Sequence, residues 1–200
     1  MSVDAPQRKL EGEKAQRIIE AMRASVAKRG AAGSTFDHVA REAGVSRGLL
    51  HYYFGSKERL LAEVVKRDTD LRMAMLDEQL AAASSADDFI AMLRRSLEAM
   101  LRDDTEFLTL SFEVFTLSRR NPEIAIEFGE LVRRTRQHVA AVLAAKQAEG
   151  VLVLRAEPEA IAEIIFGLGD GLALRILAEP DRDHRATVAA GTLAVAALIG

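Results

Sequence analysis

Residues 34–61 constrain the fold of this chain more than any other part of its sequence. They read STFDHVAREAGVSRGLLHYYFGSKERLL, with a short helical pattern over residues 35–43, a glycine at Gly44 and a second helical pattern over residues 46–53. A third helix is expected to begin at Ser56. Two short helices joined by a few residues that include glycine are typical of a helix-turn-helix, whose second helix enters the major groove of DNA. The segment therefore predicts a DNA-binding protein.

The apolar residues of this segment predict which side of each short helix is buried. The first helix has an apolar stripe at helical spacing, formed by Phe36, Val39, Ala40 and Ala43. Thr35 is placed to cap this helix, and Gly44 can adopt the left-handed conformation that ends it. Ser46 is placed to cap the second helix, whose inward contacts are expected from Leu49, Leu50 and Tyr53.

The side chains that remain on the second helix suit contacts with DNA. Arg47 can pair with a guanine edge or a phosphate, and His51 can bond to a base edge or a phosphate. Gly48 lets the helix backbone approach the DNA closely. Tyr52 and Lys57 suit phosphate contacts. The predicted DNA-binding residues are Thr35, Ser46, Arg47, Gly48, His51, Tyr52 and Lys57.

An alternative interpretation is that residues 51–54 form an aromatic core cluster and that Arg47 is a solvated surface charge. We adopt the core interpretation for Tyr53 and Phe54. For Arg47, His51, Tyr52 and Lys57 together, we favour contacts with DNA.

These positions resemble the signature of the tetracycline-repressor-type (TetR) family of transcriptional regulators. The matching residues are Thr35, Val39, Ala40, 43–46, Gly48, Leu50, 52–54 and 56–58. The likeness covers roughly the first third of the chain and includes an apolar helix before the motif, expected over residues 14–28. It implies an all-α protein with three N-terminal helices for DNA. It also implies a larger C-terminal domain that dimerises and usually binds a small-molecule effector.

Composition supports a helical protein with no cysteine chemistry. Of the 200 residues, 49% are hydrophobic and only 5% are aromatic, which favours helices over strands. The chain has no cysteine, which excludes disulfides and cysteine-based zinc or redox sites. Its N-terminus lacks the apolar stretch of a signal peptide, and no apolar run reaches the length of a membrane span. We therefore expect a cytoplasmic protein that does not associate with membranes.

The charge of the chain is divided unevenly between its two ends. The net charge is −3, but residues 1–66 carry 12 Lys and Arg against 8 Asp and Glu, a balance of +4. The rest of the chain has a balance of −7, from 15 basic and 22 acidic residues. The basic charge therefore lies at the end that carries the helix-turn-helix, as a DNA-binding surface requires.

Capping signals divide the rest of the chain into further helices. Ser85 and Asp88 have the spacing of a capping box, and Pro122 and Pro158 each follow a residue that can begin a helix. The last helix is expected over residues 185–199. Residues 151–154 resemble a strand but are too short and isolated to pair.

The sequence thus predicts about nine helices arranged in two domains. Residues 1–10 are expected to form a disordered tail and residues 11–55 the DNA-binding domain. Residues 56–200 are expected to bind the effector and to dimerise.

The last two helices have the composition of a dimer interface. Gly167, Gly169 and Gly171 interrupt an apolar helix, where each glycine costs about 1 kcal/mol and so calls for a close neighbouring helix. The final helix is rich in alanine. The predicted homodimer interface consists of Gly167, Gly171, Leu174, Ala190, Leu193, Ala194 and Ala197, which would form a two-fold four-helix bundle. The alternative is that both helices are buried within one chain.

An effector site is predicted from methionine and phenylalanine, which suit adaptable apolar pockets. The candidates are Met92, Phe112, Phe115, Phe166 and Asp170. The four apolar residues could equally be ordinary core residues, and Asp170 could instead pair with Arg175 or bond across the dimer interface. The mixture suggests a mostly apolar molecule whose identity the sequence does not give.

The predicted function is regulation of transcription. We favour a repressor that an effector releases from a palindromic operator in double-stranded DNA. The alternatives are a TetR-like activator and an all-helical ligand carrier with a vestigial helix-turn-helix. The four histidines are scattered, and no nucleophile elbow, phosphate-binding loop or dinucleotide fingerprint is present. We therefore predict no catalytic residues, no metal and no cofactor.

Overall fold

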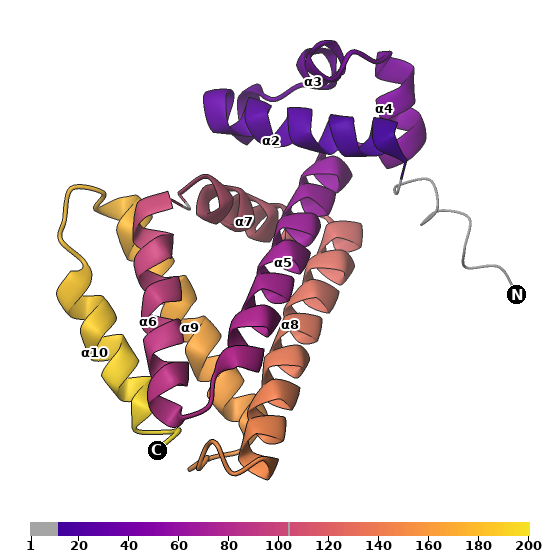
Figure 1. Cartoon of the computed structure of the whole chain (residues 1–200). Coiled ribbons are helices and arrows are strands. Elements are labelled where there is room, and N and C mark those ends of the chain that lie inside the picture. The colour runs from indigo at the N-terminus through magenta and orange to yellow at the C-terminus, as the bar shows by residue number, and fades with distance from the viewer. Residues whose placement is uncertain (1–11, 104) are drawn as a thin grey trace, which may run out of the picture. The chain divides into compact units, whose positions relative to one another are not determined.

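The computed structural model describes residues 12–103 and 105–200, so the predicted tail at residues 1–10 lies outside the described part. The described residues form nine α-helices and no strand, which confirms the all-α prediction (Figure 1). The helices are α2 (Glu13–Gly33), α3 (Phe36–Ala43), α4 (Arg47–Phe54), α5 (Lys57–Ala82), α6 (Ala86–Asp103), α7 (Thr105–Ser118), α8 (Pro122–Ala148), α9 (Pro158–Ala178) and α10 (Arg185–Ala196). None of the described helices is both long and apolar enough to cross a bilayer.

The chain divides into two compact units. The first comprises the described residues up to Thr69 together with Thr109–Phe128, and the second comprises the described residues of 70–108 together with Gly129–Gly200. Helices α5 and α8 each begin in the first unit and end in the second. The functional boundary predicted between residues 55 and 56 lies within the first unit, and it remains a prediction.

The core of the first unit joins α2 to the helix-turn-helix and to the start of α5. Its fully buried side chains are Ile18, Ile19, Met22, Val39, Leu50, Leu60, Leu61 and Val64. An ion pair between Arg23 on α2 and the buried carboxylate of Asp68 on α5 adds a polar link. Because every element of the helix-turn-helix contributes to one core, α4 is held by packing from behind and leaves its other side to solvent.

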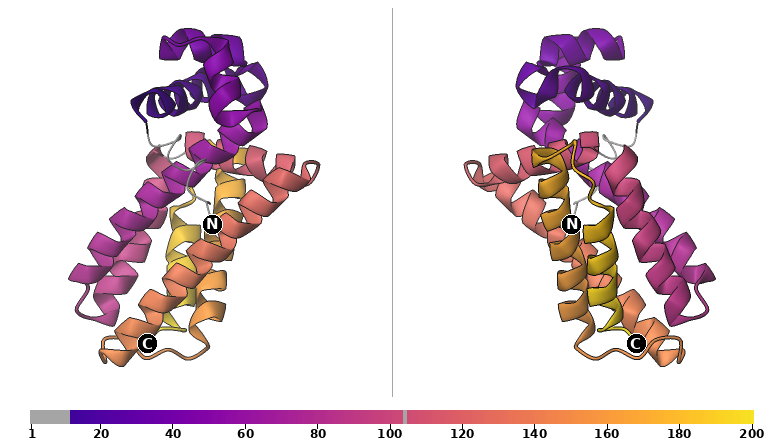
Figure 2. Two further views of the ribbon diagram at one scale, coloured as in Figure 1. Left: turned by 90° about the vertical axis from the view of Figure 1, so that its right-hand side faces the viewer. Right: turned by 90° about the vertical axis from the view of Figure 1, so that its left-hand side faces the viewer.

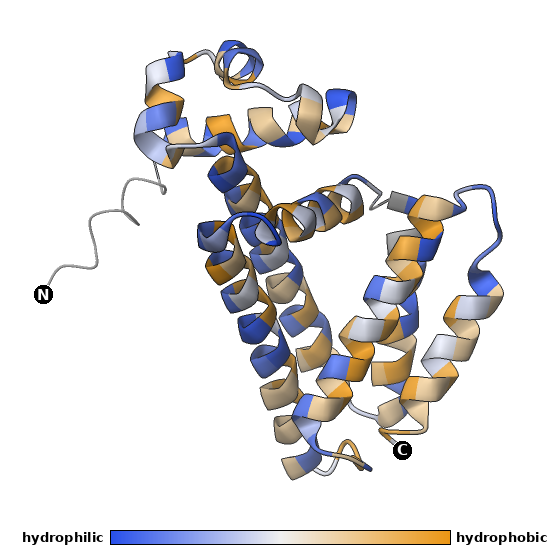
Figure 3. Cartoon of the chain, turned by 180° about the vertical axis from the view of Figure 1, so that it is seen from behind, coloured by the Kyte–Doolittle hydropathy of each residue, from blue (hydrophilic) through white to orange (hydrophobic). Residues whose placement is uncertain are grey.

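The second unit is built from the later parts of α5 and α8 together with α6, α9 and α10. In it α10 packs against both α6 and α9 (Figure 2). The core cluster is continuous across these helices and consists of Leu80, Phe89, Met92, Leu93, Val139, Ala140, Leu143, Leu152, Ile161, Ala162, Val195 and Ile199. Helix α10 consists mostly of apolar or weakly polar residues along its length (Figure 3).

The predicted capping residues begin their helices. Ser85 Oγ accepts a hydrogen bond from the Asp88 N–H at 3.2 Å, and the Asp88 carboxylate accepts bonds from the N–H and hydroxyl of Ser84. These hydrogen bonds, chiefly that from the Ser84 hydroxyl, lower the pKa of Asp88. Asn121 Oδ1 accepts from the N–H groups of Glu123 and Ile124 at 3.0 and 3.3 Å, which fixes the start of α8.

The predicted end of the last helix at residue 199 and the predicted lack of pairing at residues 151–154 are both wrong, for the same reason. Helix α10 ends at Ala196 and does not continue to Ile199. The following residues turn back, so that Leu198 O accepts from the Arg155 N–H at 2.9 Å and Gly200 O accepts from the Val153 N–H at 3.1 Å. The strand-like segment therefore does pair, with the end of the chain, although the pairing is too short to form a regular strand.

Candidate nucleic-acid interface and ligand cavity

The turn between α3 and α4 has the geometry that the sequence predicts. Thr35 is the N-cap of α3, and its hydroxyl accepts a hydrogen bond from the His38 N–H at 3.3 Å. Gly44 has φ 65° and ends the helix in the left-handed conformation. The N–H groups of Gly44 and Val45 bond to the carbonyls of Arg41 and Ala40, the pattern of a Schellman motif. A residue with a side chain would be strained at Gly44, so this glycine sets the direction in which α4 leaves the turn.

Helix α4 presents an open N-terminus to solvent. Ser46 is its N-cap residue, but the side chain makes no capping hydrogen bond, and the first turn carries no acidic residue. The N–H groups at this end therefore keep their partial positive charge, which favours a phosphate. Of the predicted DNA-binding residues, all are exposed except Lys57, which is half-buried. Phe54 is buried, as the core interpretation predicts, and Tyr53 is partly buried.

Arg47 is held only loosely by the protein itself. Its Nη1 lies 3.3 Å from Asp37 Oδ1, and both side chains are 60% exposed. Exposed pairs of this kind contribute about 0–1 kcal/mol. The guanidinium can therefore exchange Asp37 for a base edge or a phosphate at little cost.

Gly48 lies inside α4 where the chain gives no reason for a glycine. A Cβ built at this position would meet only Ser46 Oγ, at 3.9 Å, which is an ordinary contact. Glycine inside a helix is less favourable than alanine by about 0.8–1.0 kcal/mol. The missing side chain therefore fits the close approach of a partner to the exposed side of α4.

His51 and Tyr52 are arranged by neighbouring aromatic rings. The rings of His51 and Phe36 form a T-shaped pair with centroids 4.8 Å apart, and His51 Nδ1 lies 3.1 Å from Gly55 O. Because a carbonyl only accepts, Nδ1 is the donor and Nε2 of the neutral ring is left as an acceptor. Tyr52 is 60% exposed, and its ring packs edge-on against Tyr53.

Lys57 has a partner within the chain. Its Nζ donates to the carbonyl of Ala31, near the end of α2, at 2.8 Å. A phosphate at this position would compete with that bond or share the ammonium group, which has three donors.

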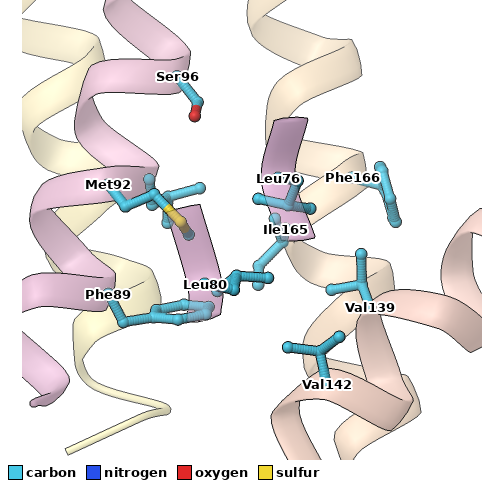
Figure 4. Close-up of a pocket in the computed structure, with 10 residues that line it drawn as sticks. Leu76, Leu80, Phe89, Met92, Ser96, Val139, Val142, Ile165 and Phe166 are labelled. Atoms are coloured by element: carbon cyan, nitrogen blue, oxygen red, sulfur yellow. The ribbon is translucent and has the colours of Figure 1, made fainter. Parts of the chain in front are cut away.

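The second unit contains an apolar cavity of about 150 Å³ between α5, α6, α8 and α9 (Figure 4). It is lined by Leu76, Leu80, Phe89, Met92, Leu93, Ser96, Val139, Val142, Ile165 and Phe166. Ser96 is the one polar residue of this lining. We call this space the α5–α9 cavity.

The α5–α9 cavity includes two of the five predicted effector residues, Met92 and Phe166. Phe112 and Phe115 belong to α7 in the first unit, where Phe115 packs against Phe128 with centroids 6.1 Å apart. Asp170 is exposed and does not line the cavity, although desolvation by the surrounding protein raises the pKa of its carboxyl group. The lining residues on α5 and α8 carry no signal in the sequence that separates them from core residues.

Helices α9 and α10 carry an exposed apolar surface. Its large members are Ile164, Leu168, Leu174 and Leu193, of which Leu193 is 71% exposed. All seven predicted dimer residues are exposed, so the alternative that they are buried within one chain is wrong for these residues. Among the described residues, apart from the glycine's chain neighbours and the backbone of its own helix, no heavy atom lies within 4 Å of the place where a Cβ at Gly167 or Gly171 would be. We call this surface the α9–α10 face.

Two family models match this sequence. The model described as "Bacterial regulatory proteins, tetR family" matches residues 18–64, and that described as "BetI-type transcriptional repressor, C-terminal" matches residues 89–199. The HTH-type transcriptional regulator BetI of Rhizobium meliloti is 29% identical over 160 residues, which cover 79% of this chain and 75% of the relative. The HTH-type transcriptional regulator CymR of Pseudomonas putida is 28% identical over 96% of this chain and 95% of the relative.

Solved structures share the fold over almost the whole chain. A TetR-family regulator from Mesorhizobium loti, itself described as putative, superposes with a TM-score of 0.76 at 21% identity, covering 98% of each chain. FadR from Bacillus subtilis, determined in complex with stearoyl-CoA, has a TM-score of 0.71 at 18% identity and covers 92% of this chain and 99% of that one. At such identities the likeness concerns the fold.

Proposed function

This chain belongs to the TetR family of bacterial transcriptional regulators, which are ligand-responsive DNA-binding repressors, and we propose that it binds a palindromic operator as a homodimer. Helix α4 enters the major groove, and the α9–α10 face joins the two copies. A small molecule in the second unit releases the DNA. Since the proposed operator is DNA within a bacterial cell, we also propose that the protein works in the cytoplasm.

The observation that carries this proposal is the state of α4. Its buried residues complete the core of the first unit, while Arg47, Gly48 and Tyr52 are exposed next to an uncapped helix start. An arginine held by one weak ion pair, a glycine with no role in packing, and N–H groups that no side chain caps together meet the needs of groove reading. Thr35, His51 and Lys57 supply further polar groups beside it.

The palindrome follows from the symmetry of the proposed dimer. A two-fold axis through the α9–α10 faces repeats α4 in opposite orientation, so each copy reads one half-site. The half-sites are then about one helical turn of DNA, or a small multiple of it, apart.

Release by an effector is proposed to act through α5. This helix begins next to the helix-turn-helix at Lys57, and its later residues Leu76 and Leu80 line the α5–α9 cavity. A ligand that favours a shifted position of α5 changes the separation of the two reading helices. To release the DNA, the ligand must bind the state that does not bind DNA more tightly than the DNA-binding state, by about 1–3 kcal/mol of binding free energy, the usual range of allosteric coupling.

The test is to select bound fragments from the source genome and to compare Arg47→Ala with the original chain on them. Losing a bidentate base contact costs about 1–3 kcal/mol per half-site, so affinity for a palindrome should fall roughly 25-fold or more. Specificity should relax at one base position in each half-site. The control is Arg182→Ala, which removes the same charge from an exposed pair with Glu179 in the second unit.

Two outcomes contradict the proposal. Equal loss of affinity in the Arg47 and Arg182 variants would mean that only overall charge matters. Absence of any preferred fragment would leave a ligand carrier, which keeps ligand affinity but has no operator. A reporter gene placed under the selected fragment distinguishes repression from activation.

A further inference from the structure

The lining of the α5–α9 cavity limits the chemistry of its occupant. Nine of its ten residues are aliphatic, aromatic or methionine, and none of the ten is charged (Figure 4). The remaining residue, Ser96, is exposed. An ion placed in such a site would lose its hydration without gaining a partner, which is strongly unfavourable. The cavity therefore selects against both anions and cations.

The aromatic rings that line the cavity do not compensate a cation for the hydration that it loses. Binding of organic cations by rings relies most on tryptophan and tyrosine, arranged around the charge. The chain contains no tryptophan, and its two tyrosines, Tyr52 and Tyr53, lie on α4 in the first unit. The cavity offers only Phe89 and Phe166, with no carboxylate among its lining residues. Two phenylalanine faces do not replace the hydration shell of an ammonium group.

The volume limits the size of the occupant. A cavity of about 150 Å³ is small compared with typical sites for drug-sized ligands, which span about 300–1,000 Å³. An engineered cavity of similar volume in another protein, lined by Leu, Ile and Phe, stays dry and binds benzene. The space here thus suits one six-membered ring with a short substituent.

We propose that the α5–α9 cavity binds an uncharged, apolar molecule of the size of a single ring, for which toluene is the probe. Only the consequence for DNA rests on the proposed function; occupancy of the cavity does not. An occupant pressed between Leu80 on α5 and Val142 on α8 contacts four helices at once, so it biases their spacing.

The first experiment measures binding by calorimetry to the full-length protein without DNA. Toluene, benzoate and benzylamine share one ring and differ in charge. Toluene should bind and raise the melting temperature, while benzoate and benzylamine should bind on the order of 100-fold more weakly because their charges lose hydration. Similar affinities for all three, or no binding of toluene, would overturn the inference.

A matched pair of variants places the ligand in the cavity. Val142→Phe adds a ring to a residue that lines the cavity and should abolish toluene binding. Ala141→Phe adds the same ring to the neighbouring exposed residue of α8 and should leave binding unchanged. Melting curves of both variants show that they are folded. Toluene binding that survives in Val142→Phe would place the ligand elsewhere and overturn the assignment.

Ser96→Asp provides a second variant whose folding is not in doubt, because the position is exposed. A carboxylate at the edge of the cavity should reduce the preference for toluene over benzylamine at least roughly tenfold. An unchanged preference would place the bound ligand away from Ser96 and would overturn its assignment to this cavity.

The DNA assay separates the two proposals. Toluene should weaken binding to the selected operator in the original chain and in Ala141→Phe, but not in Val142→Phe. If the protein binds the operator but not toluene, the proposed ligand class is overturned and the proposed regulatory function is supported. If the protein binds toluene and no operator is found, the proposed regulatory function is overturned and the proposed ligand class is supported.

Discussion

Substitution of Leu193 tests the proposed dimer surface at its most exposed point. Leu193 is 71% exposed in the single chain, and the proposed dimer would cover it. We expect Leu193→Ala to weaken the homodimer without unfolding the chain. Alanine is the most favourable helix residue, so α10 itself should remain intact.

The magnitude follows from the exposed fraction of the side chain. Burying a whole leucine contributes about 1.5–3 kcal/mol. Covering the 71% that is exposed then contributes about 1–2 kcal/mol per copy, and the two-fold axis doubles this to about 2–4 kcal/mol per dimer. At about 1.4 kcal/mol per factor of ten, the dissociation constant of the dimer should rise roughly 30- to 700-fold.

The assay is sedimentation equilibrium over a dilution series, with Ile126→Ala as the matched control. Ile126 is 74% exposed on α8, so the control removes a similar exposed aliphatic side chain from the first unit. The Ile126 variant should dimerise like the original chain. A Leu193 variant with an unchanged dissociation constant, or an Ile126 variant with the larger effect, would refute the assignment of the α9–α10 face.

Four further substitutions and titrations test other parts of the structure. Gly48→Ala should raise the free energy of unfolding by up to about 1 kcal/mol and yet lower operator affinity, as thermal melting and gel shifts will show; a gain in both would contradict close approach to DNA. Lys57→Ala should weaken binding to all sequences and reduce the salt slope by about 1; an unchanged slope would leave Lys57 only its bond to the carbonyl in α2. Gly171→Ala should stabilise the chain but weaken the dimer, whereas Gly129→Ala should stabilise it and leave the dimer unchanged, as melting and sedimentation together will decide. Hydrogen bonds donated by Arg185, the first residue of α10, lower the pKa of Asp183 to about 2. The contribution of these bonds to the stability of the folded chain is therefore present above the ordinary pKa of 3.8 and is lost as the pH falls towards 2. An NMR titration of this carboxyl group with a midpoint near 4 would contradict the hydrogen bonds between Arg185 and Asp183.

The DNA-binding end of the chain could be predicted from sequence because its signals are local. A helix start needs a hydroxyl at one position, as at Thr35, and a left-handed turn needs a glycine, as at Gly44. Both requirements are met within a few residues of chain, and the structure has both features where they were expected. The end of α10 is predicted less well because it depends on residues far away in the sequence. Val153 and Arg155 donate backbone hydrogen bonds to the carbonyls of Gly200 and Leu198, which lie beyond the end of the helix.

The ligand cavity could be predicted only in part because a cavity is a property of packing between helices. Met92 and Phe166 were identified from residue type alone. Val139 and Val142 have the same helical spacing as core residues, and nothing in the sequence distinguishes an aliphatic side chain that touches a neighbour from one that borders a void. Phe112 and Phe115 have the right chemistry, but both residues lie in the other unit.

The glycines inside helices show how sequence and structure together distinguish a residue that the fold of one chain requires from a residue that a binding surface could explain. Gly48, Gly129 and Gly171 all lie inside helices, and none has a crowded neighbour that forbids a side chain. Each therefore lowers the stability of the single chain, by up to about 1 kcal/mol. Yet a helical glycine with exposed apolar neighbours is not by itself evidence of an interface, since Gly129 also lies one turn from the exposed Ile126 and Val132. Gly171 differs in lying on the proposed α9–α10 face, with the exposed Leu174 one turn along, and Gly48 differs in lying beside the weakly held Arg47. A helical glycine points to a partner only where the neighbouring side chains are themselves exposed and suited to that partner's surface.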